Sequence, residues 1–287
     1  MKTYIFQRDT SPYVINLVKE IKLIDGLEVV ADPELADVIF CLQFGNDNAA
    51  LALQEYYPDK PFITYIWDLY ASTLFDTRGY NWEGFEKVCR NSEHCITVAE
   101  GQRQRALDIY ELEEDKITVV KRYAELFDYD DIQDKDYIYQ PLRWYPFDPQ
   151  NNWLQVAAGI LQLPFSVTDR GQGSELPLTK YKDVLANSSF LVSPYWEHST
   201  GGLSCIQAYN LGKPILYSAT EYNAGHEYLG ERAIYFSPSF DECAVTIQEI
   251  WDNRPALDLK DCQAFCQDNY AISVMAKNLA RKLKEFA

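Results

Sequence analysis

SPYWEHSTGGLSCIQAYNLGKPIL, residues 193–216, is the stretch from which the fold can best be predicted. It continues an apolar, strand-like run that begins at Phe190, passes through a polar loop with two glycines, and reaches a helical segment near Gly202. Gly212 stands where a glycine commonly ends a helix, and the next apolar run follows directly. A strand, a glycine-rich loop and a helix amino terminus together form an anion site, because free N–H groups and the helix dipole both favour a phosphate.

Alternation of strands and helices extends outward from this stretch over the whole chain. Short, nearly continuous apolar runs are typical of strands that are covered on both faces. They lie at residues 38–42, 62–66, 95–98, 117–120, 137–142, 165–168, 190–194, 214–218 and 233–236, and the chain also begins with a strand-like segment. Such runs, separated by helices, predict parallel α/β sheets.

Helical patterns fill the intervals between the strands. The first places five apolar residues on one face, behind Ser11-Pro12 as cap and first turn: Val14, Leu17, Val18, Ile21 and Ile24. The others are predicted at residues 46–57, 100–110, 150–161, 178–186, 202–211, 221–229, 241–251, 261–270 and from 271 onward.

The middle of the chain separates two such α/β series. Residues 108–136 carry eleven carboxylates against four basic groups, and residues 123–136 show little periodicity, which is typical of a connection between domains. We therefore expect two Rossmann-like, parallel-sheet α/β domains, residues 1–124 and 125–270, that face a central cleft. Ligands of such sheets bind outside the carboxyl ends of the strands.

Charge and composition exclude several classes of protein. The chain has 26 Lys and Arg against 43 Asp and Glu, a formal charge of −17, which disfavours non-specific binding to nucleic acid. No apolar run approaches the roughly 18 residues of a membrane span, and the first residues show no signal-peptide core. Seven cysteines without a C-x-x-C pair favour reduced, mostly buried thiols in a cytoplasmic protein.

The order of residues in 193–215, Ser-Pro, Glu, Gly-Gly-Leu, Gln-Ala and Leu-Gly-Lys-Pro-Ile, resembles the donor motif of retaining GT-B glycosyltransferases of family four. That motif has a glutamate, seven residues, a second glutamate, a helix of small residues and Gly-Lys-Pro-Val. The resemblance implies a GT-B fold with an acceptor-binding first domain, a donor-binding second domain, and a C-terminal helix, residues 271–287, that returns to the first domain. It also implies transfer of a sugar from a nucleotide-diphosphate sugar to an acceptor hydroxyl, with retention and without a metal or other cofactor.

The resemblance assigns roles within this loop. Glu197 matches the first glutamate if the loop is two residues longer than usual, and would contact the donor sugar. Gln207 stands at the second glutamate, which binds the ribose. His198 is a candidate contact to a sugar hydroxyl or a phosphate. The diphosphate would be held by the loop amides of Ser199, Thr200, Gly201, Gly202 and Leu203.

Other positions fit the same family more loosely. Tyr137–Arg143 resembles the first strand of the donor domain, and Arg143 would hold the diphosphate, although a surface ion pair is an equal alternative. The lysine that the family places before the next helix is absent from residues 147–152. Glu227, in Asn223–Glu227, resembles the glutamate on the donor side. Asp68 ends a strand of the first domain and is a candidate catalytic group beside Glu197 that would orient an acceptor hydroxyl, or else a cap of the next segment.

The acceptor is left open as a glycan, a lipid-linked sugar or a small molecule. A DNA glycosyltransferase acting on a hydroxymethylated base is an alternative, with a confined basic groove around Arg103, Arg105, Lys121 and Arg122. The missing lysine and Gln207 also allow a non-catalytic nucleotide- or glycan-binding protein, and a nucleotide-sugar epimerase is a third alternative. Hydrolase and nicotinamide-dependent activities are disfavoured, because neither Gly-x-Ser-x-Gly nor Gly-x-Gly-x-x-Gly occurs at the required place.

Overall fold

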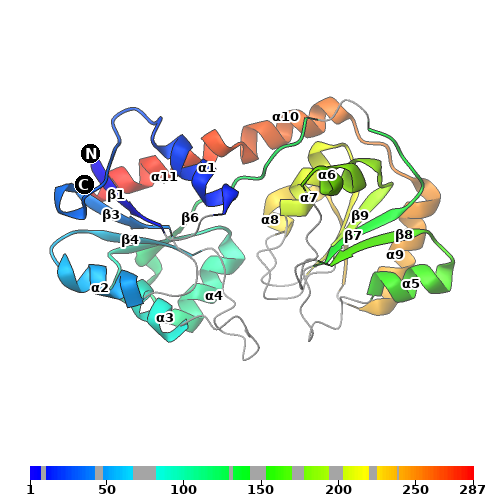
Figure 1. The fold of residues 1–287 in the computed structure, drawn as a ribbon. Coiled ribbons are helices and arrows are strands. Elements are labelled where there is room, and N and C mark those ends of the chain that lie inside the picture. The colour runs from blue at the N-terminus through cyan, green and yellow to red at the C-terminus, as the bar shows by residue number, and fades with distance from the viewer. Residues whose placement is uncertain are drawn as a thin grey trace. The chain divides into compact units, whose positions relative to one another are not determined.

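A computed structural model of the 287-residue chain describes residues 1–7, 11–42, 48–66, 82–128, 132–142, 153–169, 178–193, 203–219, 225–237 and 239–287. The chain forms two compact units (Figure 1). Unit 1 comprises Met1–Tyr123 and Ile272–Ala287, and unit 2 comprises Ala124–Ala271. The boundary therefore lies one residue before the expected position, and the C-terminal helix belongs to unit 1.

Unit 1 is built on a six-stranded sheet with the order β2-β1-β3-β4-β5-β6, and all of its strand pairs are parallel. The strands are β1 (Lys2–Phe6), β2 (Glu28–Val30), β3 (Val38–Cys41), β4 (Phe62–Ile66), β5 (His94–Thr97) and β6 (Ile117–Val119). Every residue of β3, β4 and β5 is buried, which confirms that the continuous apolar runs are strands covered on both faces.

Helices cover both faces of this sheet (Figure 1). On one face α1 (Pro12–Ile21) packs against α11 (Ile272–Leu283). On the other lie α2 (Asn48–Tyr56), α3 (Trp82–Asn91) and α4 (Glu100–Tyr110), with short 3-10 turns η1 (Pro33–Leu35), η3 (Glu114–Lys116) and η6 (Lys284–Phe286) at the ends of the elements. The predicted cap of α1 is confirmed: the Ser11 side chain accepts a bond from the Val14 N–H, with Pro12 in the first turn.

Unit 2 repeats the design with a five-stranded parallel sheet of order β11-β10-β9-β7-β8. Its strands are β7 (Ile138–Leu142), β8 (Phe165–Asp169), β9 (Phe190–Ser193), β10 (Ile215–Ser218) and β11 (Ile234–Phe236). Its helices are α5 (Trp153–Leu161), α6 (Leu178–Asn187), α7 (Leu203–Asn210), α8 (Gly225–Leu229), α9 (Phe240–Asn253) and α10 (Leu259–Tyr270), with the 3-10 turn η5 (Gly230–Arg232). Helices α5 and α9 close one apolar core with β7, β9 and β10, while α10 packs on α7.

The last residue of the first segment of unit 1 is held by a pair of tyrosines. The rings of Tyr13 and Tyr123 stack at 4.1 Å with an interplanar angle of 7°. Each hydroxyl donates to the other residue's carbonyl oxygen, at 3.1 Å from Tyr13 and 2.7 Å from Tyr123. The Tyr123 N–H also points at the sulfur of Met275 on α11, 3.2 Å away. The point at which the chain leaves unit 1 is therefore fixed against both α1 and α11.

His94 begins β5 and gives unit 1 a pH-sensitive contact. It is only 4% exposed, its Nε2 lies 3.0 Å from the Thr118 hydroxyl, and its ring packs on Phe286 at 4.9 Å. Burial, with a contribution from Lys282, lowers the pKa of His94 from 6.5 to about 4, against the opposite effect of Glu285 and Asp115. These contacts make His94 a structural residue of unit 1.

We expect the free energy of unfolding to fall as the pH is lowered from about 6.5 towards 4. The reason is that the unfolded chain binds a proton at His94 more tightly than the folded chain does. His94→Gln removes the titrating ring and should flatten this part of the pH dependence. Urea unfolding of both proteins at pH 7 and pH 5 measures the effect. The loss of unfolding free energy in the parent minus that in His94→Gln is the contribution of His94, because the carboxylates contribute equally to both. Equal losses of stability in both proteins would contradict the prediction.

Candidate functional site

The strand order of unit 2 marks one edge of its sheet as the candidate site. The chain moves outward from β7 to β8 and then returns to β9 on the other side of β7, so its direction reverses between β7 and β9. The two strands are parallel neighbours, with Tyr139 opposite Leu191. Ligands of open α/β sheets bind at such a switch point, beyond the carboxyl ends of the strands.

The predicted loop residues leave the sheet at this switch point. Arg143 directly follows Leu142, the last residue of β7, and Glu197 comes four residues after Ser193, the last residue of β9. Most of the predicted site nevertheless lies outside the described residues, and nothing is stated of its geometry: Asp68, Arg143, Glu197, His198, Ser199, Thr200, Gly201 and Gly202. The structure describes Leu203, Gln207 and Glu227.

Helix α7 carries the loop into the core of unit 2. Leu203 is its first residue and is half-buried, and every residue from Ser204 to Asn210 is buried. The helix lies between the sheet and α10, where the Cys266 thiol points at the Ile206 carbonyl oxygen, 3.6 Å away. Gly212 ends the turn with φ +70°, as its position in the sequence predicts, and an added Cβ would meet Leu259 at 3.3 Å. A rigid helix therefore fixes where the glycine-rich loop ends.

Gln207 is engaged with other parts of unit 2. Its Oε1 accepts a 2.8 Å bond from the Tyr181 hydroxyl, and its Nε2 donates to the Glu125 carbonyl oxygen at 3.3 Å. Only 9% of the residue is exposed. One turn later Asn210 donates to the Phe127 carbonyl oxygen at 2.7 Å. These two amides fasten residues 125–127 to α7, a role that the sequence analysis missed.

Part of the acidic connection, residues 124–128, packs against unit 2, although its composition predicts exposure to solvent. Phe127 is 2% exposed and packs edge-on against Tyr181, with ring centroids 6.0 Å apart, and the Lys182 ammonium lies over the Phe127 ring at 4.7 Å. Lys182 also pairs with Glu125 at 3.6 Å. Residues 124–128 are thus part of unit 2. Lys182 lies against this segment through both contacts.

Glu227 is half-buried in the first turn of α8, the helix that follows β10. It thus belongs to the connection that follows β10, at the same sheet edge as those that follow β7, β8 and β9. Its neighbour His226 is exposed, with its ring 5.1 Å from that of Tyr235. Glu227 and His226 are therefore on the element that the sequence assigned to the donor side.

At the corresponding edge of unit 1, α4 follows β5. Its N-cap residue Ala99 provides no capping side chain. Gln102 in the first turn is fully buried, and in the described part of the chain neither of its amide atoms has a hydrogen-bond partner. Arg103, by contrast, bonds Ile117 O, Glu114 O and the Glu100 carboxylate at 2.7–3.1 Å. This engagement weakens the case for Arg103 in a groove for DNA.

Within the described residues, the cysteines and the other potential metal ligands do not form a cluster. All seven cysteines are free and buried, as expected. Burial raises the pKa of Cys205, Cys243 and Cys266 to about 12, so these thiols are poor nucleophiles. Over the described ranges, no three His, Cys, Asp or Glu residues are grouped so that they could hold a metal ion. Among the helices described, none is both long and apolar enough to cross a membrane.

Comparisons with known proteins identify the fold. No protein-family model matches the chain, and a search of curated proteins gives no significant match. A structure of HepE from Anabaena in complex with UDP-glucose matches with a TM-score of 0.64 and 13% identity, covering 99% of this chain and 100% of that one. A glycosyltransferase from Rickettsia africae gives 0.64 and 12%, covering 99% and 98%. TarM gives 0.65 and 14%, and the match covers 87% of this chain but 54% of TarM.

At these identities the similarity defines the fold and nothing finer. The chain has the GT-B fold, two parallel-sheet α/β domains of Rossmann type, which confirms the fold class predicted from residues 193–216 and the apolar runs around them.

Proposed function

We propose that this protein is a glycosyltransferase that moves a sugar from a nucleotide-diphosphate sugar to an acceptor hydroxyl. The observation that carries the proposal is the connection from β9 through the paired glycines to α7, at the switch point beside β7. Structural neighbours that span the same length as this chain include a complex with UDP-glucose and a glycosyltransferase named for lipopolysaccharide biosynthesis, WaaG. Both support sugar transfer as the function, and the choice of this edge as the donor site rests on the switch point and the motif.

The proposed mechanism is retaining and independent of metal. Breaking the anomeric C–O bond leaves an oxocarbenium-like sugar and adds negative charge to the departing diphosphate. Backbone N–H groups from Ser199 to Leu203 and the Arg143 guanidinium would stabilise that charge in the transition state. Glu197 would hold the donor-sugar hydroxyls, with Glu227 on the same side. Asp68 would orient the acceptor hydroxyl, whose oxygen would bond to the anomeric carbon on the face that the diphosphate leaves, while the departing diphosphate takes the hydroxyl proton. Glycans, lipid-linked sugars and small molecules remain the candidate classes of acceptor.

Calorimetry with UDP in the presence of EDTA tests this proposal. We expect metal-free binding that Arg143→Ala weakens by about 10- to 100-fold, the usual contribution of a hydrogen bond to a charged group. Arg281→Ala makes the same change of charge on an exposed residue of α11 and should leave the affinity unchanged. Failure to bind UDP or any other nucleoside diphosphate would remove the donor site, as would an Arg143→Ala affinity equal to that of the parent.

The contacts of Gln207 favour a second candidate, a non-catalytic nucleotide-binding protein. Two of its hydrogen-bonding positions are used by Tyr181 and Glu125, which leaves one N–H and one lone pair for a ribose. Slow hydrolysis of the donor sugar in the absence of an acceptor distinguishes the two candidates, since only a transferase activates the anomeric bond.

A further inference from the structure

Strand β8 is one of the four edge strands of the two sheets, and it differs from the other three. β2, β6 and β11 have three residues each, whereas β8 has five, Phe165–Asp169. Among the strands described, β8 pairs only with β7 (Figure 1). Native proteins commonly keep edge strands short or charged, because an open row of N–H and C=O groups recruits another strand. β8 is therefore the edge that is least protected against pairing.

Every second residue of β8 directs its backbone groups away from the sheet. The Ile138 N–H on β7 donates to the Pro164 carbonyl oxygen at 3.0 Å, and Ile138 is the ladder partner of Phe165. In a parallel ladder the residue that its partner's bonds bracket turns its own N–H and C=O to the other side, and the pattern alternates along the strand. The N–H and C=O groups of Phe165, Val167 and Asp169 therefore point outward, in an arrangement that is symmetric about Val167.

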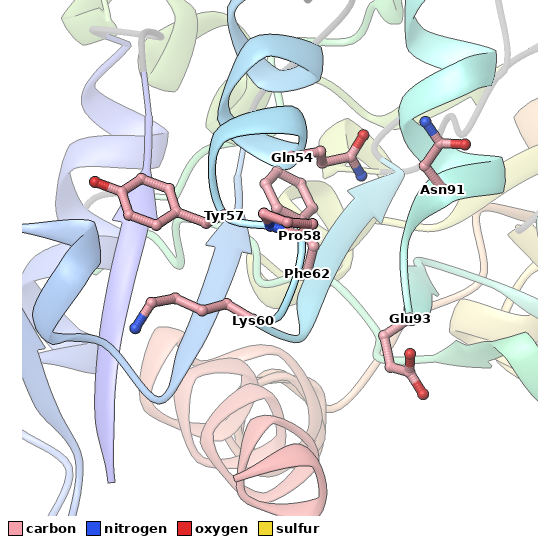
Figure 2. A pocket seen from close by; sticks show the side chains of 7 residues that line it. All are labelled: Gln54, Tyr57, Pro58, Lys60, Phe62, Asn91 and Glu93. Atoms are coloured by element: carbon pink, nitrogen blue, oxygen red, sulfur yellow. The ribbon is translucent and has the colours of Figure 1, made fainter.

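The surface around this edge carries no charge. Residues 149–168, which include α5 and all of β8 except its last residue, form the longest stretch of the chain without Asp, Glu, Lys or Arg. α5 packs on β8, and large apolar side chains are exposed on both elements. Val156 is 49% exposed, Ile160 67% and Phe165 42%. By contrast, a hollow of about 90 Å³ in unit 1 has Lys60 and Glu93 in its lining (Figure 2).

The net charge of −17 selects the partner for this edge. Two copies of so acidic a chain repel each other, so they can approach only where the surface is uncharged. A nucleic acid or an anionic membrane would be repelled in the same way, and residues 149–168 offer it no cation. A basic partner would find no carboxylate there. A second copy brings the same uncharged strand, and its outward groups complement those of the first when the two strands run antiparallel.

From these observations we propose that two copies of this protein associate through β8, in an antiparallel pair about a two-fold axis at Val167. Each Val167 N–H donates to the carbonyl oxygen of the partner's Val167, and Phe165 lies opposite the partner's Asp169. The two five-stranded sheets then join into one. Because the paired strands run in opposite directions, the switch points of the two copies open at opposite ends of the joined sheet. The contact does not depend on the proposed transfer reaction.

Sedimentation velocity of the full chain tests this proposal. At about 100 μM the parent should have twice the 33.2 kDa mass of the chain, with a dissociation constant of about 10 μM or lower. Val167→Pro removes an outward N–H that no described residue accepts, a position at which an edge strand tolerates proline. It should raise the dissociation constant by about tenfold or more, since both hydrogen bonds of the central pair are lost.

Val29→Pro is the matched control on the edge strand of the other sheet. The Glu28 N–H donates to the Met1 carbonyl oxygen, so the N–H of Val29 points away from β1 as that of Val167 points away from β7. This variant should dimerise like the parent.

Phe165→Glu and Leu23→Glu repeat the comparison with a charge in place of a proline. Both remove an exposed apolar side chain, but Leu23 lies just after α1 in unit 1, so only Phe165→Glu should weaken the dimer. Urea unfolding of each variant establishes that it is folded. A parent that stays monomeric overturns the proposal. A dimer that Val167→Pro and Phe165→Glu leave unchanged also overturns it, as does one that the two control variants weaken equally.

Discussion

Glu197→Ala should lower kcat for sugar transfer by about 10²- to 10³-fold, the usual effect of removing one preorganised polar group from a reacting centre. In the proposed mechanism this carboxylate would hold the donor sugar, and its hydrogen bonds would strengthen as positive charge develops on the ring. The affinity for UDP should change little, because UDP lacks the transferred sugar that Glu197 would contact. Initial rates with a UDP-sugar donor, together with calorimetry of UDP, measure the two effects separately.

Glu231→Ala is the control for this experiment. Glu231 is exposed in the 3-10 turn η5 and carries the same charge, so its loss should leave kcat unchanged. A Glu197→Ala protein that retained the parent rate would show that the loop is not two residues longer than in the family, and would move the sugar contact to another residue.

Gln207→Glu, which restores the glutamate that family four carries, should destabilise the protein by about 1–3 kcal/mol. The new carboxylate would face the Glu125 carbonyl oxygen, to which Gln207 Nε2 now donates a hydrogen bond of 3.3 Å, and burial would leave that repulsion poorly screened. Urea unfolding at pH 7 measures the loss. If Gln207 acts mainly on the ribose instead, the same variant should bind UDP more tightly and keep its stability.

Gln155→Glu makes the same substitution on the exposed face of α5 and should change neither stability nor affinity. A stable Gln207→Glu protein would contradict the assignment of Gln207 to the connection between α7 and residues 125–127.

Strands buried on both faces were the most predictable part of the fold. Runs such as 38–42 and 190–192 are apolar at every position because helices cover both sides of the sheet. Two elements were missed. β2 is a three-residue edge strand that pairs only with β1, and its half-exposed residues Glu28–Val30 show no continuous run. α3 has Phe85, Val88 and Cys89 at helical spacing, a signal that could have found it among its charged residues.

The environment of the site could be predicted only in part. The position of Gln207 on α7 follows from its separation in the sequence from Gly212, which ends the helix. Its partners do not, because Tyr181 and Glu125 are 26 and 82 residues away in the sequence. The same holds for Phe127: the acidic composition around it predicts exposure to solvent, whereas its side chain is buried beside Tyr181.

The discontinuity of unit 1 has a consequence for how the protein is made. Residues 124–271 form one uninterrupted unit, whereas unit 1 needs α11, which is synthesised only after the whole of unit 2. At about 5–20 residues per second, on the order of 10–30 s of translation separates Tyr123 from Leu283, the last residue of α11. During that interval the face that α11 covers with Met275, Leu279 and Leu283 stays open. Nascent unit 1 is therefore the part of this protein that exposes apolar surface to a chaperone, although its strands are synthesised before those of unit 2.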